Sequence, residues 1–100
     1  MAYFKIGKDI TVRAFYDKEE KYQNTMRTYN EDFLPVHLKL QAKKDFHGYD
    51  VLAVDEVSNS EGTTYYLLME NNKNMKRVQY AADGQHFEVI ERFRKQVLPN

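Results

Sequence analysis

The chain has 100 residues, of which 42% are hydrophobic and 14% aromatic, enough for one globular domain and too many for a disordered chain. Fifteen Lys and Arg balance fifteen Asp and Glu, so the chain has no cationic excess of the kind that drives non-specific nucleic-acid binding. The absence of cysteine excludes disulfides, cysteine-ligated zinc and thiol nucleophiles, and no apolar run approaches the roughly 18 residues of a membrane helix.

The first third of the chain predicts three strands. Residues 3–6 form a short apolar run, and residues 10–16 alternate in the period of two that is typical of a strand. A polar turn at residues 17–20 then leads into a third predicted strand over residues 21–29. Connections this short favour an antiparallel meander.

A helix is predicted over residues 33–46. Asn30 is a typical helix-capping residue, and Pro35 falls in the expected first turn, where its missing amide hydrogen costs nothing. Gly48 provides a left-handed stop just beyond the end. The predicted apolar stripe has four-residue spacing and comprises Leu34, Leu38, Ala42 and Phe46, with Leu40 beside them. The lysines Lys39, Lys43 and Lys44 are expected to face away from it.

The rest of the chain predicts four further strands, over residues 50–57, 63–69, 75–81 and 86–93. Asp83-Gly84 between the last two is a strong hairpin signal. The predicted order is βββ-α-ββββ, and the predicted fold class is α+β, an antiparallel sheet packed on one main helix.

The two ends of the chain also look like copies of one hairpin, 64 positions apart. Leu34-Pro35 aligns with Leu98-Pro99. The other aligned pairs are Tyr16 with Tyr80, Arg13 with Arg77, Glu19 with Asp83, Glu20 with Gly84 and Tyr29 with Phe93. Such a repeat indicates the folding unit from which the domain is built.

Several segments resemble the PepSY-like family, which is described as similar to the β-lactamase-inhibitor protein. The resemblance rests on Leu34-Pro35 before a Lys-rich helix that ends in the sequence Asp-Phe-His-Gly-Tyr at residues 45–49, on residues 64–67, and on residues 78–84. The family unit is a helix followed by a four-stranded antiparallel sheet. The resemblance implies a single domain over residues 1–100, with a complete second repeat at 33–93 and a partial first repeat at 3–29 that lacks its helix.

The family is common in the cell envelope of Bacteroides-type bacteria. The resemblance therefore implies a periplasmic or secreted protein, and we expect its signal segment to lie outside these 100 residues. It also implies a role in restraining a peptidase or another envelope enzyme. The contact residues of the inhibitor cannot be transferred, because no inhibitory loop matches here, so the binding residues stay unknown.

No residue pattern in the sequence predicts a metal, cofactor or catalytic site. The histidines, His37, His47 and His86, lack metal-ligand spacing. Carboxylates are adjacent at Glu19-Glu20, Glu31-Asp32 and Asp55-Glu56, but neighbours along a strand point to opposite faces, so Asp55 and Glu56 cannot share a site. Ser58 and Ser60 are predicted in a turn without a nucleophile elbow.

We predict no enzymatic activity. A small hydrolase-type enzyme would need a deep pocket that joins a carboxylate to His86 or His37.

The basic and aromatic residues leave two interpretations of the surface open. The cations Lys39, Lys43, Lys44, Arg77, Arg92, Arg94 and Lys95 are either nucleic-acid contacts or, as the neutral total charge favours, solvated side chains. Tyr65 and Tyr66 are adjacent, so they must point to opposite faces of the sheet. A single helix covers only one face, so large side chains must lie on the other. Those side chains either pack across strands or contact a partner. We predict a protein or peptide partner, no nucleic acid and no membrane insertion. The alternative is a self-associating structural protein of the cell envelope, a homodimer in which a second copy completes the partial first repeat.

Overall fold

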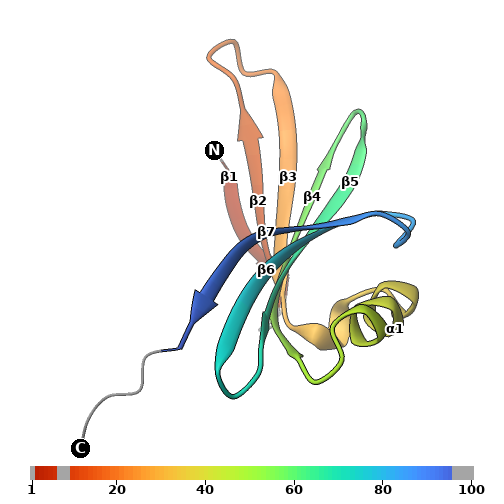
Figure 1. The fold of residues 1–100 in the computed structure, drawn as a ribbon. Coiled ribbons are helices and arrows are strands. Elements are labelled where there is room, and N and C mark those ends of the chain that lie inside the picture. The colour runs from red at the N-terminus through yellow and green to blue at the C-terminus, as the bar shows by residue number, and fades with distance from the viewer. Residues whose placement is uncertain (1, 7–9, 96–100) are drawn as a thin grey trace, which may run out of the picture.

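The protein is described by a computed structural model that places the backbone of residues 2–6 and 10–95 and the side chains of residues 10–95 (Figure 1). Strands dominate the order of elements along the chain. The elements are β1 (Ala2–Ile6), β2 (Ile10–Tyr16), β3 (Tyr22–Tyr29), the 3-10 turn η1 (Glu31–Phe33), α1 (Val36–Asp45), β4 (Asp50–Asn59), β5 (Gly62–Glu70), β6 (Asn74–Ala81) and β7 (Phe87–Arg94).

All of these strands belong to one antiparallel sheet, in which spatial order equals chain order. The predicted fold class is wrong, because the structure is mostly antiparallel sheet with one short helix, 58% strand and 15% helix. A helix-plus-four-strand unit preceded by a partial unit does not describe it. The physical reason is the ladder between β3 and β4, which pairs residues 25–29 with residues 54–58 and merges the expected units into one continuous sheet.

The helix is shorter than the predicted span of 33–46. A 3-10 turn occupies the first residues of the predicted helix. The Asn30 side chain caps this turn by accepting a hydrogen bond from the Asp32 amide at 2.9 Å. Leu34 is extended (ψ 135°), as expected for a residue before proline, and α1 therefore begins only after Pro35. Gly48 takes the expected positive φ of 87° beyond the helix end.

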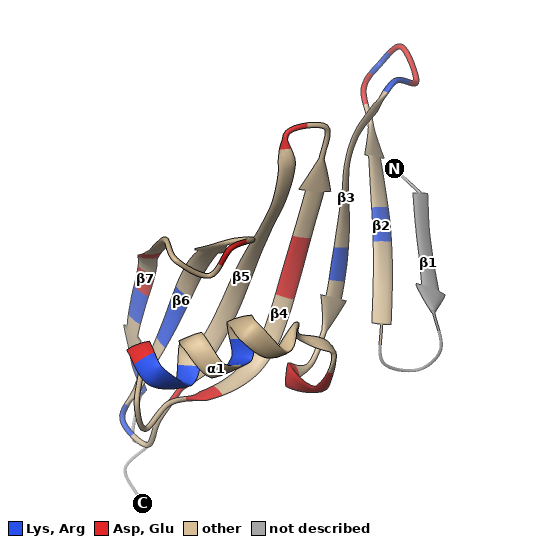
Figure 2. Ribbon diagram, turned by 90° about the vertical axis from the view of Figure 1, so that its right-hand side faces the viewer, with Lys and Arg blue, Asp and Glu red and all other residues tan. Residues whose placement is uncertain are grey.

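The main core lies between α1 and one face of the sheet. Figure 2 shows α1 crossing in front of β4, β5 and β6, whereas β2 and β3 have no helix in front of them. The buried cluster comprises Tyr29, Leu34, Leu38, Ala42, Phe46, Val51, Val54, Leu67, Met69, Val78 and Tyr80. Leu40, predicted beside the apolar stripe, is instead 64% exposed, because it lies on the solvent side of α1.

Two hairpin turns share an unusual backbone conformation. Gly84, between β6 and β7, has φ 75°, and Glu20, between β2 and β3, has φ 64°. These are two positions that the repeat alignment pairs. Gly84 is also buried, and a Cβ placed there would lie 3.2 Å from Leu38, so this turn packs tightly on α1. The Leu98-Pro99 part of the repeat lies outside the described residues.

The hairpin between β4 and β5 is tighter than predicted. β4 continues to Asn59 and β5 begins at Gly62, so the connection is two residues long rather than five. Ser58 consequently lies in the ladder, where its hydroxyl is 3.0 Å from that of Thr63. Only Ser60 of the two serines remains in the turn.

Candidate binding surface

The sheet has one face that α1 covers and one that it leaves uncovered, which we call the open face. Strand register assigns residues to each face, because side chains alternate along a strand. The open face carries a row of directly paired residues across β2 to β7, namely Thr11, Thr28, Asp55, Tyr66, Gln79 and Glu88. Tyr65, one residue earlier than Tyr66, packs against the main core. The expectation that these two tyrosines point to opposite faces is confirmed.

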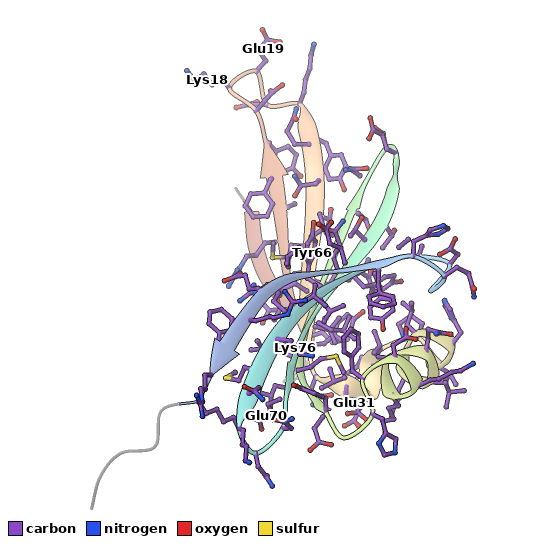
Figure 3. All side chains as sticks on the ribbon, in the orientation of Figure 1. Lys18, Glu19, Glu31, Tyr66, Glu70 and Lys76 are labelled. Atoms are coloured by element: carbon purple, nitrogen blue, oxygen red, sulfur yellow. The ribbon has the colours of Figure 1, made fainter. Side chains whose placement is uncertain are left out.

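A shallow hollow of about 370 Å³ lies on the open face. Apolar and charged side chains from β3, β4, β5, β6 and β7 line it. They are Met26, Asp55, Val57, Tyr66, Arg77, Ile90 and Glu91. Tyr66 lies at the middle of the sheet in Figure 3.

A β-bulge shapes one wall of this hollow. Arg77 pairs with Glu91 and Val78 pairs with Val89, so Ile90 is an extra residue in β7. The bulge disrupts the regular alternation of β7 and leaves Ile90 38% exposed at the rim. The surface therefore combines Tyr66, Arg77 and Met26, three residue types that are enriched in protein interfaces.

The charged side chains of the hollow contact partners on the neighbouring strands. Arg77 Nε lies 3.3 Å from a Glu91 carboxylate oxygen, close enough for an ion pair. The same nitrogen is buried and forms no hydrogen bond with another described residue. Asp55, in contrast, accepts from the Thr28 hydroxyl at 2.7 Å. The Arg77–Glu91 ion pair thus lines the hollow, and both side chains remain partly exposed there.

The face under the helix holds tyrosine hydroxyls bonded to carboxylates. Tyr29 donates to Glu56 at 2.8 Å, Arg27 donates to the other oxygen of Glu56 at 3.2 Å, and Tyr80 donates to Asp45 at 2.9 Å. Burial, followed by the bonded carboxylate, raises the pKa of both Tyr29 and Tyr80 far above the ordinary value. Burial also raises the pKa of Tyr65, with the Glu56 charge adding to the effect. All three phenols stay neutral, and those of Tyr29 and Tyr80 act as structural donors.

The histidines have separate surroundings and do not converge. His37 Nε2 lies 2.9 Å from the Ala82 carbonyl oxygen, His86 Nδ1 lies 3.5 Å from Asp83, and His47 is exposed. Within residues 2–6 and 10–95, no group of three or more His, Asp or Glu side chains could hold a metal ion.

The carboxylate pairs likewise form no shared site. Asp55 bonds Thr28 on the open face and Glu56 bonds Tyr29 on the other, which confirms that this pair divides between faces. Glu31 binds Lys39 and Lys43 at 3.4 and 3.3 Å. Burial opposes its ionisation, but the hydrogen bonds and charges of the two lysines outweigh that effect and lower its pKa. The pair Glu19-Glu20 belongs to the exposed β2–β3 turn.

The basic residues singled out in the sequence are dispersed. Lys39 and Lys43 bind Glu31, Arg77 lies on the open face, and Lys95 binds Glu70. Arg92 and Arg94 gather instead with Lys76, which the sequence pattern had not indicated. Met26, Val57 and Ile90 were also missed. Only the register of the strands, including the bulge at Ile90, brings them beside Tyr66.

Comparison with known proteins finds no family model, no curated protein and no solved structure that matches the chain. The described part of the chain has no helix of the length and apolarity that crossing a membrane would take. The chemistry of the surfaces themselves is therefore what supports a function.

Proposed function

We propose that this chain is a non-catalytic binding module that engages a protein or peptide partner through the open face of its sheet. The observation that carries the proposal is the hollow around Tyr66, which combines this tyrosine with the partly exposed Arg77–Glu91 ion pair and the exposed Ile90. A partner that covers this hollow would remove apolar surface from water and meet the exposed charges of Arg77 and Glu91.

The cellular setting of the proposal comes from the PepSY-like resemblance. A secreted or periplasmic module that restrains a peptidase or another envelope enzyme needs an exposed recognition surface and no catalytic group of its own. The separated histidines and carboxylates of the described residues are compatible with that role. No particular enzyme is named, but the surface of this chain that would contact it is the open face of the sheet.

Position-specific photo-cross-linking tests this proposal. A photoreactive phenylalanine analogue replaces Tyr66 on the open face or, as the matched control, Phe33, which is 44% exposed on the helix side. Each variant is illuminated in an envelope extract. We expect a covalent adduct from position 66 and none from position 33. Equal adducts from both positions, or none from position 66, would contradict the proposal.

Self-association is the second candidate, and the β2–β3 hairpin favours it. No helix lies in front of this hairpin in Figure 2, and Tyr16 and Tyr22 pack edge to face there with ring centroids 6.2 Å apart while about half exposed. A second copy that covered this hairpin would bury both rings. Light scattering across a dilution series tests it, because a monomer at every concentration excludes a stable dimer.

A further inference from the structure

A second hollow, of about 440 Å³, lies beside the outer edge of the sheet, where β7 is the last strand. We call it the cationic hollow. Its lining combines three basic residues with aromatic and polar ones, namely Tyr49, Asn74, Met75, Lys76, Arg92, Phe93 and Arg94. Figure 2 shows the Lys and Arg segments of β6 and β7 next to each other.

The strand register places like charges against each other in this hollow. Lys76 pairs directly with Arg92, and Arg94 lies two residues further along the same side of β7, opposite Asn74. Directly opposed like charges destabilise a sheet. No carboxylate of the described residues forms an ion pair with Lys76, Arg92 or Arg94. The fold therefore tolerates an uncompensated positive site, and a bound anion would remove the repulsion.

Lys76 is held in position by two aromatic rings. Its ammonium lies 4.7 Å from the ring centre of Tyr49 and 5.3 Å from that of Phe46. Such cation–π contacts fix the amine without neutralising its charge. Arg92 and Arg94 are more exposed, and their planar guanidinium groups suit carboxylates. The hollow thus combines one cation that aromatic rings hold in place, Lys76, with two exposed cations that can adjust to a ligand, Arg92 and Arg94.

The arrangement along β7 matches an extended chain. Side chains two residues apart on a strand point the same way, about 7 Å apart, so Arg92 and Arg94 would face alternate side chains of a segment lying alongside β7. β7 is an edge strand of the sheet, and within residues 2–6 and 10–95 no strand pairs with the outer side of its backbone. An edge strand can accept an added strand, with cross-strand charge pairs selecting the sequence.

We propose that the cationic hollow binds an extended acidic segment of a partner protein, with carboxylates at alternate positions meeting Arg92 and Arg94. The inference rests on the proposed function in one respect, that the partner is a protein. Nucleic acid fits less well, because three cations are too few for a phosphate track and the whole chain has no net positive charge.

Fluorescence anisotropy with a labelled probe tests the inference. The probe is a peptide of about eight residues that alternates Glu and Val, titrated with the protein at about 20 mM and about 150 mM salt. The double variant Arg92→Gln/Arg94→Gln should bind it about fivefold to tenfold more weakly. The control Lys18→Gln/Lys21→Gln removes the same charge from the distant β2–β3 turn and should bind within about twofold of the unmodified protein.

A second variant, in which the two arginine charges are reversed, tests the same inference in the opposite direction. Arg92→Glu/Arg94→Glu should lose the acidic probe and gain a peptide that alternates Lys and Val. Absence of binding to the acidic probe, equal loss in the control, or tighter binding of a thymidine oligonucleotide of about eight nucleotides would overturn the inference. Failure here is distinguishable from failure of the proposed function, because cross-linking at position 66 uses a different face and leaves Arg92 and Arg94 intact.

Discussion

The helix-covered region and the β2–β3 hairpin belong to one sheet, but they are stabilised very differently. All eleven members of the main buried cluster fall between Tyr29 and Tyr80. The hairpin contributes Tyr29, the last residue of β3, to that cluster, whereas its other buried residues, Val12 and Ala14, lie outside it. Apolar burial is the dominant stabilising term in folding, so local stability should be high under α1 and low in the hairpin.

Truncating one core residue in each region gives the largest expected difference. Leu38 is fully buried, and Leu38→Ala should lower the free energy of unfolding by about 3 kcal/mol. Val12→Ala removes fewer methyl groups and should cost about 1 to 2 kcal/mol. Urea denaturation measures both values, and native-state hydrogen exchange should show amides of β5 and β6 outlasting those of β2. Equal losses of unfolding free energy and equal protection from hydrogen exchange would show that the two regions do not differ in stability.

The two left-handed turns provide a sharper comparison. Gly84→Ala forces an alanine into φ 75° and brings its Cβ to 3.2 Å from Leu38, so we expect a loss of about 2 kcal/mol. Glu20→Gly relieves the same conformation at φ 64° in an exposed turn and should gain about 0.5 to 1 kcal/mol. Thermal unfolding of the two variants should therefore shift in opposite directions. A loss in both would show that the Glu20 side chain stabilises its turn.

Removing a buried hydroxyl should produce a smaller effect. Tyr80 is fully buried and donates to Asp45, so Tyr80→Phe removes one hydrogen bond to a carboxylate and should cost about 1.5 kcal/mol. Tyr22→Phe is the control in the hairpin, where an exposed hydroxyl lies 2.7 Å from that of Thr25, and should cost under about 0.5 kcal/mol. Chemical denaturation compares them. A larger cost for Tyr22 would reverse the ranking of the two regions.

The ion pairs at the start of the helix predict the smallest effect and its pH dependence. The pKa of Glu31 is lowered on folding, so its contribution is present above its ordinary pKa and is lost as the pH falls through the lowered value. Glu31→Gln should therefore cost about 0.5 kcal/mol at neutral pH and nothing in strong acid. Unfolding curves at several pH values measure this difference. A constant difference at every pH would show that packing, not charge, is responsible.

Local signals predicted the turns well and the surface poorly. Asp83-Gly84 and Gly48 indicated turns by their chemistry alone, and the structure has positive φ at both glycines. The predicted start of the helix was wrong because Pro35 favours an extended conformation at Leu34, which prevents α1 from beginning before it. A one-residue shift exchanges the faces of a strand, so the bulges at Ile90 and between Val51 and Ala53 decide which side chains meet. The hollow around Tyr66 depends on that register, so it could not be predicted from the sequence.

Neighbouring strands in this sheet are also neighbours in the chain, which bears on the order of folding. Most ladders close over a short turn, such as the two residues between β4 and β5 or the few between β6 and β7. The ladder between β3 and β4 must instead close over the segment that carries η1 and α1. Since closing a longer loop costs more entropy, the β4–β7 meander should assemble first, with the hairpin joining it late. Mutations in β4 to β6 should then slow refolding, whereas those in β2 should chiefly speed unfolding.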